Sequence, residues 1–331
     1  MAVSRRAVLT GLAGLTGAGL AAGLTGCGGA EAASGEGNSG VTLKHKFGTT
    51  VVPKPPTRVV SLGTTDHDVA LALGITPLSI SNFVGTPTGV GPWAEKQLGK
   101  ARPQLYTGGA EVSVESVAKL RPDLILAVEN DLTKDRYDKL SQLAPVVAPP
   151  AGYIDWGVPW QLQTRSIGAA LGKAQAAEQL ISAVTARFAA AKRQHPAFVG
   201  KTAVVASVYA GAAGVYNAYT KQDSRLQFMA GLGLKPAPRV DALGSTRFTV
   251  PISREKVDLL EADVVVIIAF DDVSNKAVDN DRLFAGLNAS KRKAVIRLTI
   301  TGVGLAMSAN SVLSIPYALD GLLPKMAAIL R

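Results

Sequence analysis

The chain has 331 residues, of which 47% are hydrophobic and only 18% are charged, and its formal net charge is +10. This length suits two domains, and the composition excludes a chain too polar to bury a core. The basic excess does not indicate nucleic-acid binding, because the most basic segment, Lys291-Arg292-Lys293, is only three residues long. We expect a solvated basic surface instead.

Residues 1–26 have the features of an export signal. Arg5-Arg6 precede an apolar stretch rich in glycine, which is typical of a twin-arginine signal. Leu24-Thr25-Gly26-Cys27 then matches the bacterial lipobox at every position. The apolar stretch is also long enough for a transmembrane helix, but a cysteine directly after Leu-Thr-Gly favours the lipobox. We therefore predict that the signal is cleaved before Cys27 and that Cys27 is lipidated.

Residues 27–40 are predicted to form a flexible tether behind the lipid. After Cys27, this segment contains no large apolar side chain. A random coil of this composition and length spans roughly 20 Å. Because Cys27 is the only cysteine, an intramolecular disulfide is excluded. The sequence thus predicts an exported protein, lipid-anchored to the outer face of the cytoplasmic membrane.

Residues 41–157 are predicted to form an N-terminal α/β lobe. Apolar and β-branched runs predict strands at 58–62, 75–81, 104–107, 123–128 and 145–148, separated by helices at 66–73, 113–120 and 132–143. Strands that alternate with short helices indicate a mostly parallel sheet.

A long helix at 173–194 is the most regular element of the sequence. No glycine or proline interrupts it, and at 1.5 Å per residue it would run roughly 33 Å. Its apolar residues recur at three- and four-residue spacing and form one stripe: Ala177, Leu180, Ile181, Val184, Phe188 and Ala191. Together with a preceding helix at 160–171, it makes up a linker of residues 158–195. We interpret the long helix as a strut between two similar lobes.

Residues 196–331 are predicted to form a C-terminal α/β lobe of related build. Residues 252–266 align without gaps with residues 112–126, at a constant offset of 140. Each copy has a serine suited to cap a helix, an acid in the first turn, and then an aspartate before a buried strand. Convergence can explain the match, since any α/β unit uses a cap, a helix and an apolar strand, but two copies at matching places in the two halves support two lobes of related build. The predicted fold class is α/β, with two Rossmann-like lobes, mostly parallel sheets and one long connecting α-helix.

The sequence contains no convincing catalytic or metal-binding motif. The histidines lie far apart, and neither a Walker A sequence nor a G-x-S-x-G sequence occurs. Ser253-Arg254-Glu255-Lys256 fits the S-x-x-K of exported penicillin-binding enzymes, but the motifs that accompany it there are missing. We therefore predict that the protein is not an enzyme and has no metal site of its own, with an exported α/β enzyme as the weaker alternative.

Aromatic residues in glycine-rich loops point to a ligand site at the strand ends, where α/β folds place ligands. In such loops we expect a cleft with flat apolar walls. Arg247 would supply a cation for an anionic ligand oxygen. The candidate ligand-binding residues are Thr65, Phe83, Trp93, Tyr209, Tyr216, Tyr219, Arg247 and Phe270.

Four features together resemble a known family. Arg58–Leu62, Ala70–Leu78, Ser113–Leu126 and the long helix are similar to the periplasmic-binding domain of iron-siderophore, haem and cobalamin ABC importers, over roughly 41–330. The resemblance implies a monomer that captures its ligand between two lobes and delivers it to an ABC permease and its ATPase. It requires no resident cofactor, since the iron arrives with the ligand.

The resemblance also suggests docking residues and a ligand. In this family a glutamate on each lobe contacts the permease, and Glu115 stands where the glutamate of the first lobe is expected. Where the glutamate of the second lobe is expected, this chain has Ala230, so we assign this role to Asp223 upstream. A ferric siderophore is the expected ligand, of hydroxamate type because Arg247 is the only cation we place in the cleft. Haem, with a tyrosine or His67 as axial ligand, and cobalamin are the alternatives.

Overall fold

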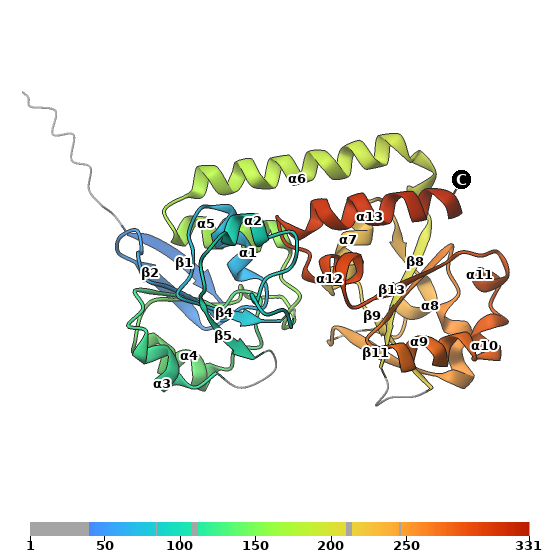
Figure 1. Ribbon diagram of the computed structural model, residues 1–331, viewed down its shortest axis with the longest axis horizontal. Coiled ribbons are helices and arrows are strands. Elements are labelled where there is room, and N and C mark those ends of the chain that lie inside the picture. Colours follow the sequence, from blue (N-terminus) through green and yellow to red (C-terminus); the bar gives the residue numbers. More distant parts are fainter. Residues whose placement is uncertain (1–39, 84, 108–111, 210–213, 245, 331) are drawn as a thin grey trace, which may run out of the picture. The chain divides into compact units, whose positions relative to one another are not determined.

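The computed structural model describes residues 40–83, 85–107, 112–209, 214–244 and 246–330. The fold lies in one compact unit, Asn38–Arg331. The predicted export signal, Cys27 and the tether up to residue 39 lie outside the described residues. Two separate sheets organise the unit (Figure 1). We call the elements within residues 41–157 the first lobe and those within residues 196–330 the second lobe.

The sheet of the first lobe is parallel throughout, in the order β5-β4-β3-β6-β7. Its strands are β3 (Val59–Ser61), β4 (Ser79–Asn82), β5 (Gln104–Thr107), β6 (Leu124–Leu126) and β7 (Val146–Val147). Its helices are α1 (Asp66–Ala72), α2 (Glu95–Leu98), α3 (Val114–Lys119) and α4 (Lys134–Ser141). Every residue of β3 and β6 is buried, as expected for parallel strands covered on both faces. β4 begins later than predicted because Pro77 has no N–H for the ladder.

A hairpin that the sequence analysis did not predict opens the first lobe. Strand β1 (Val41–His45) pairs antiparallel with β2 (Gly48–Val52). Gly48 has φ +129°, a backbone conformation that glycine adopts without strain. The hairpin is joined to the lobe by the hydrogen bond from Thr50 Oγ1 to the carbonyl of Val146, at 2.8 Å.

The sheet of the second lobe is mixed, with the path β11-β9-β8-β12-β13. Its strands are β8 (Thr202–Val208), β9 (Val215–Tyr219), β10 (Lys235–Pro236), β11 (Thr249–Ser253), β12 (Val264–Ala269) and β13 (Val295–Thr299). β8, β12 and β13 are parallel as predicted, whereas β9 pairs antiparallel with both of its neighbours, β8 and β11. Its helices are η1 (Pro196–Phe198), α7 (Ser224–Gly231), α8 (Pro238–Asp241), η3 (Arg254–Leu260), α9 (Asp272–Asp279), α10 (Arg282–Ala285), α11 (Asn288–Lys291), α12 (Gly302–Ala309) and α13 (Ser314–Ile329).

The two aspartates of the internal repeat, Asp123 and Asp263, accept the same pair of hydrogen bonds from a threonine in each lobe. Asp123 accepts hydrogen bonds from the backbone N–H and the hydroxyl of Thr57, at 2.8 and 2.9 Å. Asp263, its counterpart, accepts the same pair of bonds from Thr202, both at 2.8 Å. Each aspartate precedes a buried strand and ties it to the start of a neighbouring strand, β3 or β8. The two lobes are therefore alike in how their central strands are joined.

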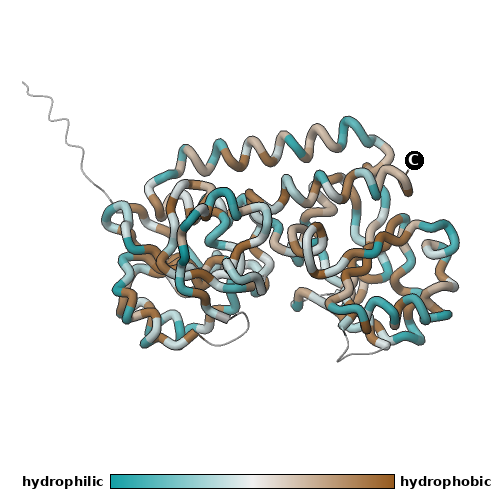
Figure 2. The backbone as a smooth tube through the Cα atoms, in the orientation of Figure 1, coloured by the Kyte–Doolittle hydropathy of each residue, from teal (hydrophilic) through white to brown (hydrophobic). Residues whose placement is uncertain are grey.

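Helix α6 (Ala174–Gln194) is the predicted strut, and it follows α5 (Trp160–Ala170). It packs against α5 and also against α13 of the second lobe (Figure 1). Apolar and polar residues alternate along it, as Figure 2 shows. The buried residues are those of the predicted stripe except Leu180, which is partly buried. Among the helices of the described ranges, none combines the length and apolarity needed to cross a bilayer.

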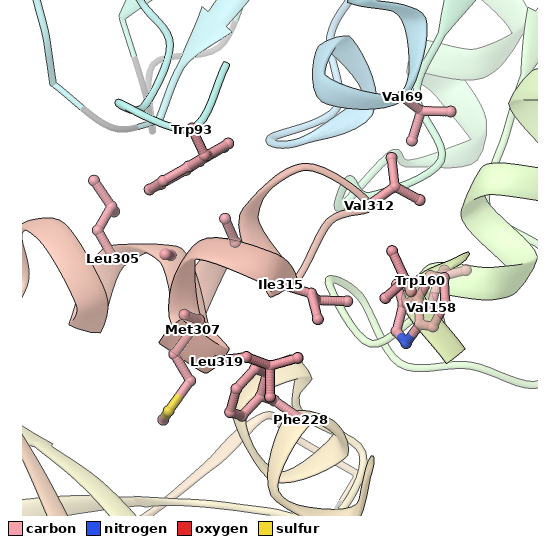
Figure 3. Packing of buried hydrophobic residues seen from close by; sticks show 14 of the residues in the cluster. Val69, Trp93, Val158, Trp160, Phe228, Leu305, Met307, Val312, Ile315 and Leu319 are labelled. Carbon is pink, nitrogen blue, oxygen red and sulfur yellow. The ribbon is translucent and has the colours of Figure 1, made fainter. Parts of the chain in front are cut away.

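The strut is not the only connection between the lobes. One continuous cluster of buried apolar residues contains side chains of both lobes. In Figure 3, Val69 and Trp93 of the first lobe lie beside Leu305, Val312 and Ile315 of the second. This shared core makes the connection broader than the single helix that the sequence predicted.

A buried carboxylate adds a polar tie inside the shared core. Asp68 of α1 accepts hydrogen bonds through Oδ2 from the indole N–H of Trp93, at 2.8 Å, and from the hydroxyl of Ser311 in the second lobe. Asp68 and Ser311 are both buried. The two lobes are thus joined by helix α6, by apolar packing and by this hydrogen-bonded carboxylate.

Candidate functional site

A cavity of about 580 Å³ lies between the two lobes, within the size range of small-molecule sites. The first lobe contributes residues that follow the carboxyl ends of β3, β4 and β6, and the second contributes the start of α7 and the end of α12. The described lining residues are Thr64, Thr65, Ser81, Asn82, Phe83, Gly85, Glu129, Trp156, Asp223, Ser224, Arg225, Phe248, Ser308 and Ala309.

Three aromatic side chains line this cavity. Trp156 and Phe248 contact each other edge to face, with ring centroids 5.7 Å apart, and Phe83 lines the cavity from the first lobe. Trp156 has φ +55°, a conformation that non-glycine residues rarely adopt and that occurs often at functional sites. These rings offer flat apolar surfaces for a ligand to pack on.

Arg225, at the start of α7, is the cation of the cavity and is held from three sides. Its Nη1 pairs with Asp223 Oδ2 at 2.9 Å, and its Nε donates to Ser308 Oγ at 2.9 Å. Its guanidinium also lies over the ring of Tyr219, 4.0 Å from the centroid. Arg225 lines the cavity, so this fixed guanidinium is available to an acceptor oxygen of a ligand there. Burial alone would lower the pKa of Arg225, but the charges of Asp223, Tyr219 and Glu129 and the hydrogen bond to Asp223 together raise it, so the guanidinium stays charged.

Two buried carboxyl groups of the first lobe interact with each other, and one of them, Glu129, also interacts with Arg225. Asp66, at the start of α1, accepts hydrogen bonds from the N–H groups of Val128 and Glu129, at 2.7 and 3.1 Å, and from Gln163 Nε2 at 2.8 Å. Burial raises the pKa of Asp66 to about 6, although these hydrogen bonds lower it. Burial, with the charges of Asp66 and Asp223, raises the pKa of Glu129 well above its usual value.

The cavity can hold a ligand but offers no metal-binding set. In the part of the chain that the structure describes, no group of three or more His, Cys, Asp or Glu side chains could hold a metal ion. The aromatic rings supply contact area, and Arg225 supplies a fixed hydrogen-bond donor. Such a site suits a molecule that brings its own metal, fully chelated.

Two of the predicted residues line the cavity, and a third supports it. Thr65 and Phe83 are lining residues, as expected for groups that follow strands β3 and β4. Tyr219 is buried beneath Arg225 and holds the guanidinium from below. Contact of these side chains with a ligand stays a prediction.

Trp93 and Arg247 require correction. Trp93 is only 9% exposed and belongs to the shared core, because its N–H is bonded to buried Asp68. Arg247 lies at a separate shallow depression, while its neighbour Phe248 lines the cavity. The two residues lie in the bend that precedes β11, and only Phe248 is a lining residue of the cavity. Arg225 takes the role that the sequence analysis gave to Arg247.

The remaining aromatic candidates gather elsewhere on the second lobe. Tyr209 and Tyr216 line a depression of about 260 Å³, and Phe270 packs edge-on against Tyr209, with centroids 6.2 Å apart. The hydroxyl of Tyr216 donates to Asp281 Oδ2 at 2.8 Å. These three residues do not line the cavity between the lobes, so their prediction as members of its wall is wrong.

The two predicted docking acids have opposite environments. Glu115 is exposed in the first turn of α3, where a partner can reach it. Asp223 is only 2% exposed and paired with Arg225 at the cavity. An acid buried in an ion pair is not available to a docking protein, so the assignment of Asp223 to the permease surface is wrong.

Sequence reasoning missed Glu129, Trp156 and Arg225. Glu129 follows the buried strand β6, and the rule that ligands bind at strand ends could have found it. Trp156 and Arg225 gave no comparable signal, because each is brought to the cavity by the way the lobes pack.

The chain resembles known proteins over most of its length. It matches the family model described as periplasmic binding protein over residues 59–300. A periplasmic solute-binding protein from Mycobacterium smegmatis is 34% identical, with 88% of this chain and 99% of that chain covered and a TM-score of 0.77. An iron-uptake ABC transporter substrate-binding protein of Streptococcus pneumoniae, solved with ferrichrome, is 29% identical, with coverage of 88% and 98% and a TM-score of 0.74.

A curated relative agrees with these structures. "Probable siderophore-binding lipoprotein YfiY" of Bacillus subtilis is 26% identical over 249 residues, which are 73% of this chain and 72% of that protein. These relatives are named as binding proteins and not as enzymes. The solved relatives confirm the predicted α/β fold class.

Proposed function

This chain belongs to the periplasmic binding protein family, and we propose that it is the substrate-binding lipoprotein of an ABC importer for a ferric siderophore. The ligand is captured in the cavity between the lobes and passed to a membrane permease. The siderophore is of the hydroxamate type. Relatives named for siderophore binding and for a complex with ferrichrome support this proposal.

The charge of the cavity is the observation that carries the hydroxamate assignment. Arg225 is the only cation among the described lining residues, and Asp223 already balances it. A ferric trihydroxamate core is neutral, because its three hydroxamate anions balance Fe³⁺. A ferric catecholate is strongly anionic and would need several further cations to offset its desolvation. The cavity therefore fits the neutral chelate better.

Haem is less well supported by the lining of the cavity. No described lining residue is a tyrosine, histidine, methionine or cysteine, the usual axial ligands of haem iron. His67, the candidate axial ligand, is buried within α1 beside Asp68, with Nε2 at 3.6 Å from Oδ1. No specific contact favours cobalamin.

The proposed partners follow from the family and from exposed groups. Lipid on Cys27 would anchor the monomer to the outer face of the cytoplasmic membrane, where the permease and its ATPase operate. Glu115 is the proposed docking acid of the first lobe. Glu255, its counterpart in the repeat, is exposed at the start of η3 and replaces Asp223 as the proposed docking acid of the second lobe.

Titration with ferrichrome tests the proposal through tryptophan fluorescence. Trp156 lines the cavity and Trp93 does not, so we expect saturable quenching that W156F reduces more than W93F does. Equal quenching in the two variants would place the chelate elsewhere. If no ferric siderophore binds while haemin gives a shifted Soret band, the ligand is haem.

A further inference from the structure

Glu129 has an unusual position in the wall of the cavity. It follows β6, lines the cavity and is only 7% exposed. The backbone N–H of Val158 donates to its carboxyl group. The other oxygen, Oε2, is buried and has no hydrogen-bond partner among the described residues. A carboxylate with one unpartnered buried oxygen is strongly destabilised.

The charged groups around Glu129 do not compensate a negative charge there. Asp66 on α1 and Asp223 at the start of α7 both disfavour its ionisation, and Arg225 on α7 favours it. Arg225 is already committed to Asp223 through two hydrogen bonds from Nη1, at 2.9 and 3.2 Å. One cation thus serves both Asp223 and Glu129. Burial and the charges of Asp66 and Asp223 hold the pKa of Glu129 well above its usual value of 4.5.

We propose that Glu129 carries a proton when the cavity receives its ligand, and that binding of the chelate requires this proton. The proposal rests on the proposed function, since it concerns how the same cavity accepts the siderophore. Ionisation of Glu129 would place an uncompensated negative charge in the wall of the cavity and weaken binding, most of all for an anionic chelate.

Ligand binding and protonation of Glu129 are coupled. A bound chelate displaces water from the cavity, so the ionised form of Glu129 becomes still less favourable in the complex. The pKa of Glu129 is then higher in the complex than in the free protein. Affinity is therefore constant while the free protein is protonated, and it falls by up to about tenfold per pH unit above that point. The total loss of affinity at high pH is larger for an anionic chelate, because the ionised carboxylate of Glu129 repels it.

The decisive variant is E129Q, which is close in shape and permanently neutral. Its amide oxygen can still accept from Val158. Because the raised pKa destabilises the fold above pH 4.5, where the unfolded carboxyl ionises, E129Q should be at least as stable as the unmodified protein at neutral pH. E115Q is the matched control, since it makes the same substitution at an exposed site outside the cavity.

The experiment measures affinity for neutral ferrichrome and for an anionic ferric catecholate, from about pH 6 to about pH 9. We expect affinity to fall with rising pH in the unmodified protein and in E115Q, and to stay level in E129Q. The catecholate should bind more weakly than ferrichrome. Calorimetry in two buffers of different ionisation heat should show proton uptake on ferrichrome binding at the alkaline end, absent from E129Q.

An infrared measurement decides the protonation state without any ligand. A carboxylic-acid carbonyl band should be present near neutral pH and be absent from E129Q. Absence of that band, or parallel pH profiles for the unmodified protein and E129Q, would overturn the inference. If the unmodified protein binds no ferric siderophore at any pH, the proposed function fails instead, and the infrared band still decides whether Glu129 holds its proton.

Discussion

Removing the charge of Arg225 is expected to weaken ferrichrome binding about 100-fold, the loss of one charge-assisted hydrogen bond in a desolvated site. Arg225 is the only cation among the described lining residues, and we expect its guanidinium to donate to an acceptor oxygen of the chelate. Arg225→Gln alone would leave Asp223 buried and unpaired, which costs about 3–5 kcal/mol of stability. The test therefore uses the double variant Asp223→Asn with Arg225→Gln, in which both charges are absent.

Arg247→Gln is the matched control for this prediction. Arg247 lies at a depression outside the cavity, so its substitution should leave the dissociation constant within about twofold. Titration calorimetry with ferrichrome, together with thermal unfolding of each variant, separates lost binding from lost folding. Weakened binding in Arg247→Gln, with unchanged binding in the double variant, would mean that Arg247 and not Arg225 is the cation that contacts the ligand.

Replacing Asp68 by alanine is expected to lower the free energy of unfolding by about 3 kcal/mol, because two donors lose their acceptor inside the core. These donors are the indole N–H of Trp93 and the hydroxyl of Ser311, on opposite sides of the contact between the lobes. Asp68→Asn should lose far less, since both bonds end on Oδ2 and an amide oxygen can replace it. The other oxygen, Oδ1, has no hydrogen-bond partner to lose among the described residues.

Asp320→Ala provides the comparison at the surface. Asp320 on α13 pairs with Arg187 on α6, also joining distant elements, but both side chains are substantially exposed. Its loss should change stability by less than about 1 kcal/mol. Urea unfolding of the three variants measures the differences. Equal losses for Asp68→Ala and Asp320→Ala would mean that the buried tie contributes no more than a solvated ion pair.

Most parallel strands and the main helices could be predicted, because their sequence patterns are local. The apolar stripe of α6 predicts which face of that helix is buried, and the aspartates at 123 and 263 mark the starts of the buried strands β6 and β12. Strands β9 and β11 were missed because both follow glycine-rich or polar loops and neither shows a run of buried apolar residues, so their pairing is not visible in the local sequence. Pro251 within β11 also argues against a strand, and an edge position is where a sheet tolerates it.

The site was harder to predict than the fold, because the cavity is formed by the packing of two lobes. The strand-end rule correctly placed Thr65 and Phe83 at its wall. It could not separate Arg247 from Phe248, since both are exposed residues of the bend before β11. Nor could it show that Trp93 turns inward to Asp68. Asp223 was wrongly predicted to be a docking residue, because the sequence does not show that it is buried and paired with Arg225.

The most direct test of this account is the position of iron in crystals of the protein loaded with ferrichrome. Anomalous scattering at the iron edge locates the metal whatever the orientation of the ligand around it. The account predicts one iron peak in the cavity between Arg225 and the rings of Trp156 and Phe248. A peak beside Tyr209 and Phe270 on the second lobe, or no bound iron in crystals grown with excess ferrichrome, would contradict it.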